Sequence, residues 1–553
     1  MFLAKAASFL ASNLIAAQAG TPLPLPPPNI VIILADDMGF CDLGCYGGEI
    51  RTPNIDALAA GGVRFTQFYN AGRCCPSRAC LLTGLYPHQA DVGWMTSGSL
   101  DRPGYRGELS RDAVTIAEVL HGAGYSTYMC GKWHLSKDDW PQGPRPNWPR
   151  QRGFDRFYGT NKGGGGYFDP DPLVRDDRRI TAASDAEYRP KHFYYTDAIA
   201  DQAARFVSEH AGQHEDKPFF LYVAFTAPHW PLQAPAAAIA KYRGKYDGGY
   251  EPIRLRRFER EKQLGIIRPD AELSPTVGNW NEQPNKAWEA RCMEVYAAQV
   301  EVMDAGVGRI VQALKEAHQF ERTLVLFLSD NGGCAEKVGR QSRPNGPGTN
   351  AVPRRFTRDG RPIRDGPDAL PGPDDTFIAY GRNWANVSTT PFRLYKQWVH
   401  EGGIATPLIA HWPNGIPRRG ELERQPAHLI DIMPTCVAVA AARYPRQYNG
   451  HAITPLPGLS LLPTFHGKSL DRKAPIFWEH EGNRAIQSGQ WKLVAKGGDG
   501  PWELYDMNAD RTELHDLSGK QRERAKEMAA QWQQWAQANN VLPLNPFKIP
   551  QQQ

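Results

Sequence analysis

The sequence lacks any apolar run long enough to cross a bilayer, and it lacks any run of lysines and arginines typical of nucleic-acid binding. Charges of the two signs nearly cancel, with 64 lysines and arginines against 59 aspartates and glutamates. No internal repeat is evident. The 41% of hydrophobic and 22% of charged residues exclude wholesale disorder. A chain of 553 residues with this composition is expected to be globular and to hold more than one domain.

The first residues have the layout of a secretory signal peptide. Lys5 precedes an apolar stretch over 6–17, and Ala17-Gln18-Ala19 forms a small-residue cleavage site. Polar residues interrupt the apolar stretch, so a frayed or misassigned N-terminus is the alternative interpretation. We expect export, and therefore a secreted or periplasmic protein without stable membrane insertion.

The nine cysteines are an odd number, and five of them lie between positions 41 and 80. In an exported protein some could pair, but the pairing among Cys41, Cys45, Cys75 and Cys80 cannot be read from the sequence. The spacing of Cys41 and Cys45 suits zinc, whereas Cys74 and Cys75 are adjacent and make a poor chelate. Structural zinc is therefore the less favoured interpretation.

Four apolar segments, each followed by polar residues, are predicted to be buried strands of a parallel sheet. The carboxyl ends of parallel strands meet at one edge of a sheet, and ligands of open α/β sheets bind at that edge. We expect the functional site there. The segments with their following residues are Asn29–Leu34 with Asp36-Asp37, Tyr125–Cys130 with Lys132-Trp133-His134, Phe219–Phe225 with Pro228-His229, and Thr323–Leu328 with Asp330-Asn331.

Segments with helical apolar spacing fill the intervals between these strands. They are Thr52–Gly61, Ala113–His121, Thr196–His210 and Ala287–Ala317. Alternation of strands and helices over most of the chain predicts an α/β fold, with a large, mostly parallel sheet sandwiched by helices.

From about residue 470 the pattern changes to that of a smaller antiparallel sheet with a helix. Arg484–Gln487 and Trp491–Ala495 flank Ser488-Gly489, a hairpin signal, and Trp502–Tyr505 adds a strand before the helical segment 521–539. We divide the chain into a signal peptide (1–19), a catalytic α/β domain (20–469) and a C-terminal subdomain (470–553).

Two stretches rich in proline, glycine and arginine, 231–284 and 335–391, are predicted to be long loops that form lids or substrate walls. Their aromatic residues could stack on a substrate ring or anchor the loops themselves. These residues are Trp230, at the edge of the first stretch, with Trp280, Tyr380 and Trp384.

The segment Cys74-Cys75-Pro76-Ser77-Arg78 places a thiol near the start of a predicted helix, where backbone N–H groups favour an anion. One helical turn brings Arg78 to the same side as Cys74. A thiol nucleophile is one interpretation, and a buried cysteine with a surface arginine is the other.

With Leu81, Thr83 and Gly84 following, this segment resembles the signature of the formylglycine-dependent (type I) sulfatases, whose fold is alkaline phosphatase-like. In that family the cysteine is oxidised to formylglycine (3-oxoalanine), an aldehyde. The resemblance implies that Cys74 is the precursor and that a formylglycine-generating maturation enzyme is a partner. This chain has Leu85 where the family usually has arginine, and Cys75 or Cys80 could block conversion by forming a premature disulfide.

The resemblance extends from Asn29 to about Leu517 and includes further elements in the family's order. It implies that Asp36, Asp37, Asp330 and Asn331 are calcium ligands, with residue 74 completing the set. It also assigns Lys132, His134, His229 and Lys396, the last standing five residues before Glu401-Gly402-Gly403, to catalysis. The segments Gln490–Val494 and Glu503–Asp506 resemble the family's C-terminal subdomain.

Three carboxylates and an amide form an all-oxygen ligand set that suits one hard cation such as Ca²⁺. For each pair alone, capping of the next helix is the alternative role. Two such pairs, each after a buried strand, favour a metal site.

A hydrated aldehyde explains how a sulfate ester could be cleaved without attack by water on sulfur. One hydroxyl of the gem-diol attacks sulfur and expels the alcohol, and loss of the proton from the second hydroxyl then releases sulfate. Arg78, Lys132 and Lys396 suit the non-bridging oxygens, and Lys396 or His229 could protonate the leaving oxygen. The resemblance assigns Asp330 as the base in attack and His134 to the elimination step.

The resulting hypothesis is a calcium-dependent sulfuric ester hydrolase acting on an aryl or carbohydrate sulfate ester. The first alternative is a phosphonate or phosphodiester hydrolase of the same superfamily. The second is a secreted, non-catalytic protein that binds sulfated glycans and keeps Cys74 as a thiol. The sequence does not identify the sulfate ester.

Overall fold

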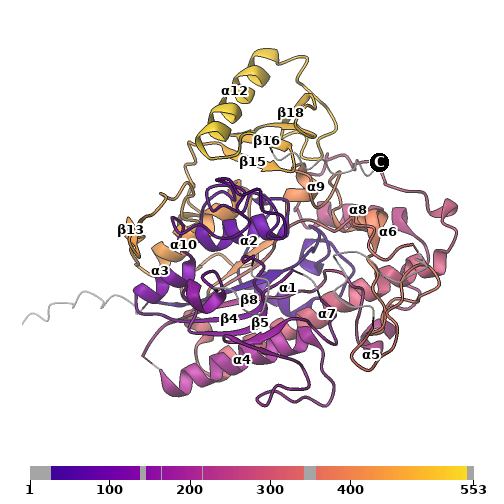
Figure 1. Ribbon diagram of the computed structural model, residues 1–553. Coiled ribbons are helices and arrows are strands. Elements are labelled where there is room, and N and C mark those ends of the chain that lie inside the picture. Colours follow the sequence, from indigo (N-terminus) through magenta and orange to yellow (C-terminus); the bar gives the residue numbers. More distant parts are fainter. Residues whose placement is uncertain (1–26, 138–144, 164, 215, 342–355, 545–553) are drawn as a thin grey trace, which may run out of the picture.

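The computed structural model describes residues 27–137, 145–163, 165–214, 216–341 and 356–544 (Figure 1). The expected signal peptide over 1–19 lies outside the described residues. Among the helices of the described ranges, none has both the length and the apolar character needed to span a membrane.

A ten-stranded sheet forms the centre of the molecule, in the order β11-β2-β10-β9-β1-β8-β4-β5-β6-β7. The adjacent strands β9, β1, β8, β4 and β5 run parallel, and β10 and β6 flank them antiparallel, so the expectation of a mostly parallel sheet is confirmed. The strands are β1 (Asn29–Ala35), β2 (Val63–Phe65), β4 (Ser126–Lys132), β5 (Arg156–Thr160), β6 (Leu173–Arg175), β7 (Arg178–Ile180), β8 (Phe219–Ala224), β9 (Thr323–Ser329), β10 (Leu408–His411) and β11 (Glu421–Glu423).

Strand β1 shows why these apolar segments form the centre of the sheet. Its side chains alternate between two cores: Val31 and Ile33 belong to one, and Ile32 and Leu34 belong to the other. All four are fully buried. Burying each such side chain contributes about 1.5–3 kcal/mol, so a segment that is apolar at every position is stable only with both faces covered.

Helices cover both faces of the sheet (Figure 1). On one face lie α1 (Pro53–Ala60), α4 (Tyr195–Gln213) and α7 (Lys286–Glu316), of which α4 and α7 pack against each other. On the other lie α2 (Cys74–Thr83), α3 (Ile116–Gly122) and α10 (Ile432–Val439). This arrangement confirms the predicted α/β sandwich.

Shorter elements complete the catalytic part of the chain. The remaining helices there are α5 (Ala236–Ala240), α6 (Tyr250–Gln263), α8 (Gly381–Ser388), α9 (Glu401–Ile404) and α11 (Leu462–Phe465), with 3₁₀ helices at Gly44–Tyr46, Pro149–Arg152, Trp280–Glu282, Phe320–Arg322 and Leu429–Asp431. The two-residue strands β3 (Phe68–Tyr69) and β12 (Ala427–His428) pair in parallel, and β13 (Gln447–Tyr448) and β14 (His451–Ala452) form a small hairpin.

A separate four-stranded antiparallel sheet and one helix form the C-terminal part, as the change of pattern predicted. The strands are β15 (Ile476–His480), β16 (Asn483–Ser488), β17 (Trp491–Ala495) and β18 (Trp502–Asp506), and α12 (Arg522–Ala538) packs on one face through Met528 and Trp532. Ser488 pairs with Trp491 around the tight turn, where Gly489 adopts a φ of 56° that suits glycine.

The other face of this sheet is joined to the α/β part of the chain by buried charges. The Lys492 ammonium lies 2.9 Å from Glu401 Oε1 at the start of α9 and 2.8 Å from Glu513 Oε1. The Tyr69 hydroxyl donates to Glu401 Oε2 at 3.2 Å. Because the three charged side chains are fully buried, their pairing is required for the two parts to pack.

The prediction that 231–284 and 335–391 are long loops was wrong in part. The first contains α5 and α6, and the second contains α8. Helix α6 is rich in charged residues, yet Arg254 and Arg257 are buried, and Arg257 pairs with Asp42 and Glu49. Such helices depend on tertiary partners rather than on an apolar stripe, so the apolar spacing does not predict them.

Candidate functional site

The neighbouring strands β1 and β9 bring their following polar residues together. Ala35 pairs with Ser329, so Asp36 and Asp330 leave the sheet side by side. Asp37 adopts a φ of 66°, and its N–H donates to Asp330 Oδ1 at 3.2 Å. Asn331 Nδ2 donates to Asp37 Oδ1 at 2.7 Å. The four residues predicted to bind metal therefore form one cluster.

The donor atoms of this cluster fit a hard cation. Asp36, Asp37, Asp330 and Asn331 are at most 1% exposed, and Asp36 Oδ1 and Asn331 Oδ1 are buried with no hydrogen-bond partner. An unpartnered buried oxygen is costly unless it binds something. Oxygen ligands of this kind are what Ca²⁺ prefers.

Three cationic side chains face the three carboxylates. Lys132 Nζ lies 2.6 Å from Asp36 Oδ2, and Lys396 Nζ lies 2.7 Å from Asp37 Oδ1. Arg78 Nη2 lies 2.9 Å from Asp330 Oδ2. Each carboxylate of the cluster therefore has a cationic partner.

The ionisation of Asp36 and Asp330 differs although both are buried. Burial opposes ionisation of Asp36, but the charges of Lys132, His229 and Arg78 outweigh it and lower its pKa to about 2. Burial raises the pKa of Asp330 well above its usual range, and the neighbouring Asp36 charge adds to the effect. Of these two adjacent carboxylic acids, Asp36 is therefore the stronger acid and Asp330 the weaker one.

Cys74 is the first residue of α2, as predicted, and it is 2% exposed. Ser77, the fourth residue of the motif, accepts a hydrogen bond from the backbone N–H of Ala71 at 3.0 Å. That bond holds the turn that leads into the helix. A hydrogen bond from Cys75 lowers the pKa of the Cys74 thiol well below its usual value, and burial opposes the shift.

Arg78 links α2 to two strands of the sheet. Its Nη1 donates to the Lys132 carbonyl at the end of β4 at 2.8 Å, while Nε and Nη2 donate to Asp330 Oδ2 after β9. The expectation that Arg78 and Cys74 face the same side of the helix is met. Arg78 is fully buried, unlike the surface arginine of the alternative interpretation.

Strand β4 extends two residues beyond its predicted end and therefore includes Lys132. Gly131, with a φ of 106°, is required there because a Cβ would lie 1.9 Å from the Ala224 carbonyl. His134 follows with a φ of 57°, and its ring packs directly against Gly163. A side chain at position 163 would clash with the ring, because a Cβ there would lie 2.1 Å from His134 Cε1. Burial lowers the pKa of His134 to about 4.

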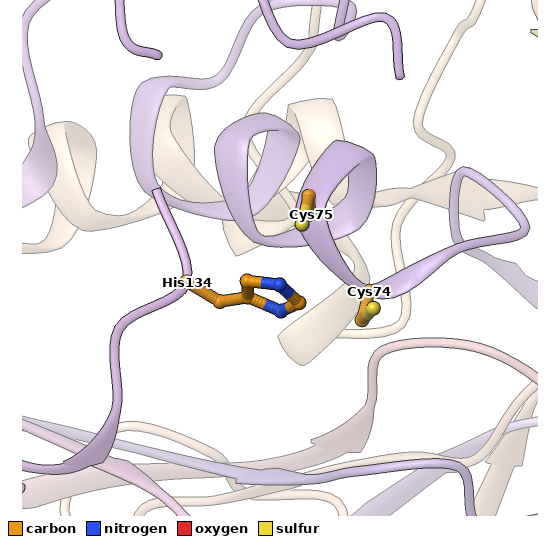
Figure 2. Close-up of side chains that lie close together, drawn as sticks. All are labelled: Cys74, Cys75 and His134. Atoms are coloured by element: carbon orange, nitrogen blue, oxygen red, sulfur yellow. The ribbon is translucent and has the colours of Figure 1, made fainter. Parts of the chain in front are cut away.

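Figure 2 shows the His134 ring reaching from its loop toward the first turn of α2, where Cys74 and Cys75 lie. Potential ligand atoms of the three residues are within 4.8 Å of one another. A histidine from the end of β4 is thus brought to the cysteine at the start of α2.

His229 and Lys396 reach the cluster from two further segments. The His229 Nε2 atom lies 3.4 Å from Asp37 Oδ2, and Nδ1 donates to the Trp230 carbonyl at 2.6 Å. Lys396 is held by its backbone N–H, which donates to the Gly333 carbonyl at 3.1 Å. All the site residues predicted from the sequence are therefore brought together.

The structure adds a salt bridge that the sequence analysis missed. Arg73, which directly precedes Cys74, lies 2.9 Å from Glu336, and Trp230 Nε1 donates to Glu336 at 2.6 Å. Burial opposes ionisation of Glu336, but Lys396 and Arg73 lower its pKa to about 2. The position of Arg73, directly before Cys74, was the one feature of the sequence that could have pointed to this salt bridge. Its partner follows β9 and could be found only from the tertiary structure.

Several aromatic and histidine residues have structural roles. Trp384 and Tyr380 are at most 3% exposed and belong to a core, so they anchor their loop. Trp280 packs edge-on against Trp384. His400 is fully buried, and His411 stacks on Phe320.

The nine cysteines all lie in the described residues and are free thiols in the structure. Cys80 Sγ lies 3.9 Å from His428 Nδ1, on the opposite side of α2 from the charged cluster. Cys41 contacts the carbonyls of Val387 and Ser388. No pairing among the candidates Cys41, Cys45, Cys75 and Cys80 is formed in the described part of the chain.

Comparison with known families identifies relatives over nearly the whole chain. A family model described as Sulfatase matches residues 28–442, well over half of the sequence. A second model, described as N-sulphoglucosamine sulphohydrolase, C-terminal, matches residues 392–539.

Individual relatives agree with the family models. An uncharacterised sulfatase of Schizosaccharomyces pombe is 33% identical over 536 residues, covering 91% of this chain and 92% of that protein. An arylsulfatase of Klebsiella aerogenes is 32% identical over 474 residues, covering 81% and 94%. The crystal structure of Ps i-CgsB in complex with k-i-k-neocarrahexaose is 28% identical, with a TM-score of 0.65 over 93% of each chain.

Proposed function

The chain belongs to the sulfatase family, and we propose that this sulfatase cleaves an aryl or carbohydrate sulfate monoester with a formylglycine made from Cys74 and one Ca²⁺. The observation that carries the proposal is the pairing of Arg78, Lys132 and Lys396 with three buried carboxylates, close enough to Cys74 for their charges to act on it. These groups come from five segments of the chain. Burying charged side chains costs free energy, so a function at this position is the better explanation for their gathering there.

Residue 74 would supply the nucleophile. In its aldehyde form it adds water, and the hydrate offers a hydroxyl that attacks sulfur and later releases sulfate by elimination. An unmodified thiol lacks the second hydroxyl that this release requires. The start of α2 favours the anion that develops there, because its first backbone N–H groups have no partner within the helix.

Asp36, Asp37, Asp330 and Asn331 would hold Ca²⁺, which supplies positive charge to the sulfate group and lowers the pKa of a bound hydroxyl. The unpartnered oxygens Asp36 Oδ1 and Asn331 Oδ1 support this assignment. Removal of either oxygen donor should weaken calcium binding without removing the cationic side chains.

The cationic side chains would neutralise and orient the sulfate group. Lys132 and Lys396 are at most 2% exposed, so their charges act in a site with little water, where electrostatic interactions are strong. His229 and Lys396 both contact Asp37 and stand on the side of the cluster from which a leaving oxygen could be protonated. His134, beside residue 74, is placed to take the proton of the second hydroxyl.

Export and maturation are part of the same proposal. Residues 1–19 would direct the chain out of the cytoplasm, and a formylglycine-generating enzyme would convert Cys74 on the way. The N-terminal sequence of the exported protein tests the first point, because cleavage after Ala19 would leave Gly20 as the first residue.

The mass of the peptide that contains Cys74 tests the mechanism. The protein is expressed with its maturation enzyme and digested, and the peptide is expected to lose H₂S, gain one oxygen and react with a hydrazide. The same preparation should hydrolyse 4-nitrophenyl sulfate or a sulfated sugar faster than the matching phosphonate or phosphodiester.

Cys74→Ala is expected to reduce hydrolysis to background, and Cys75→Ser is the matched control that should keep the aldehyde and the activity. Undiminished hydrolysis by Cys74→Ala would exclude the mechanism. Retention of sulfated ligands without turnover, by protein whose Cys74 stays a thiol in the presence of the maturation enzyme, would instead support the binding-protein alternative.

A further inference from the structure

The first turn of α2 contains a second thiol that the proposed reaction does not use. Cys75 is fully buried, lies 3.9 Å from the Thr96 hydroxyl and hydrogen-bonds with the neighbouring Cys74 thiol. Together with Cys74 and His134 it forms a group whose ligand atoms all lie within 4.8 Å of one another (Figure 2). Its sulfur and imidazole ligands differ in chemical class from the carboxylate and amide oxygens of the proposed calcium site.

The His134 ring gives independent support for a ligand at this position. The side chain is 8% exposed, and its Nδ1 atom is buried without a hydrogen-bond partner. Metal-bound histidines commonly use one nitrogen for the metal, and a buried nitrogen without a partner is otherwise unfavourable. The packing of Gly163 against the ring limits its movement away from the two thiols.

We propose that chains in which Cys74 has not been converted bind a soft metal ion, Zn²⁺ being the best fit, through Cys74, Cys75 and His134. Thiolate and imidazole are the ligands that zinc prefers. Zinc at about 2.3 Å from sulfur and about 2.0–2.1 Å from nitrogen holds its ligand atoms about 3.5–3.8 Å apart. Side-chain rotations that shorten the distances between ligand atoms by about one ångström would bring the observed group to that spacing.

The charges around the site permit this binding. Zn²⁺ displaces whatever protons the two thiols still carry, so that the dication and two thiolates form a neutral complex and those protons are released. The lysines that lie near Cys74, Lys132 and Lys396, are each paired with an aspartate. Three protein ligands leave a fourth position open.

Adjacent cysteines alone make a poor chelate, as the sequence indicates, but here a third ligand comes from the loop after β4, 60 and 59 residues away. Conversion removes the Cys74 sulfur, so bound zinc and formylglycine exclude each other. Bound zinc would therefore mark chains that escaped maturation and would occupy the position of the nucleophile.

Metal binding by unconverted protein tests the proposal independently of catalysis. The full chain is produced without the maturation enzyme, its unmodified Cys74 is verified by peptide mass, and zinc content is measured after dialysis. Co²⁺ is then substituted, because thiolate-to-cobalt charge-transfer absorption reports sulfur ligands and does not arise from the aspartate cluster. Cys75→Ser is compared with Cys80→Ser, a buried cysteine on the same helix that faces His428.

We expect about one zinc ion per unconverted wild-type or Cys80→Ser chain, with the charge-transfer band. Cys75→Ser, which keeps only the Cys74 thiolate, should weaken the band and bind zinc at least about tenfold more weakly. Absence of zinc from the wild-type chain, or an unchanged band in Cys75→Ser, would overturn the proposal. Neither result would affect sulfate hydrolysis by converted protein, whose failure would instead count against the proposed function.

Discussion

Arg78 and Asp330 are 252 residues apart in the chain, and the Arg78 guanidinium donates two hydrogen bonds to one oxygen of Asp330, at 3.1 and 2.9 Å. Both side chains are fully buried. The other Asp330 oxygen accepts from the Asp37 N–H. This contact ties the helix that carries the proposed nucleophile to the strand end that carries the proposed metal ligands.

Arg78→Lys is expected to lower kcat for sulfate ester hydrolysis by about 10²–10³, because a lysine keeps the charge but cannot make the three hydrogen bonds. Steady-state kinetics with 4-nitrophenyl sulfate measures the effect. Arg419→Lys, at an exposed position, is the control and should leave kcat unchanged. A kcat within threefold of wild type would show that the Arg78–Asp330 contact is not needed for the reaction.

Removal of calcium is expected to lower both activity and thermal stability of the converted protein. Three buried carboxylates and two unpartnered oxygens favour binding to the folded chain, and an ion at 100 times its Kd stabilises by about 2.7 kcal/mol. Melting curves with a chelator and with added Ca²⁺ measure the shift. Asp36→Asn should reduce the shift in melting temperature. A wild-type melting temperature that is unchanged by both the chelator and added Ca²⁺ would contradict the assignment.

Lys492→Met is expected to destabilise the protein by about 3–5 kcal/mol, because it leaves Glu513 buried without its cationic partner and Glu401 paired with Arg511 alone. Chemical denaturation gives the difference in unfolding free energy. Adding Glu401→Gln and Glu513→Gln to the variant should recover part of the loss. An effect no larger than that of the exposed Lys520→Met would mean that the buried charges do not support the subdomain contact.

The stability of the protein should fall between pH 6.5 and about 4, and His411 is expected to contribute. Burial lowers the pKa of His411 from 6.5 to about 4, so the unfolded chain binds a proton in this range that the folded chain does not. In His411→Leu, the loss of unfolding free energy between pH 7 and 5 should be about 2 kcal/mol smaller. His466 is exposed, so the control variant His466→Leu should lose as much unfolding free energy between pH 7 and 5 as the wild type. An equal loss in His411→Leu and wild type would refute the prediction.

Much of the fold could be predicted because its strands are continuously apolar. The runs Ile30–Leu34 and Leu324–Leu328 have no polar position that could face water, so both had to lie inside a covered sheet. The turn at Ser488-Gly489 was predictable because Gly489 adopts a left-handed conformation. Helix α6 was not predictable from apolar spacing, because its buried face includes two arginines.

The residues of the candidate site were found from short motifs and strand ends, and their roles remain predictions. The motif at Cys74-Cys75-Pro76-Ser77-Arg78 is local, so the sequence shows it directly. The pairing of Arg73 with Glu336 and the approach of His134 to Cys75 have no local signal. They depend on which loops the sheet order brings together.

The sequence by itself determined the buried strands and several of the helices that cover them, which strand ends carry carboxylates, and which cysteine begins the motif helix. Apolar period, turn residues and local motifs act over a few residues, and each can be read along the chain. Only the tertiary structure decided that β1 and β9 are neighbours, and that Arg78, Lys132 and Lys396 each meet a different carboxylate. Contacts between residues hundreds of positions apart depend on strand order and register, which burial of the whole chain selects.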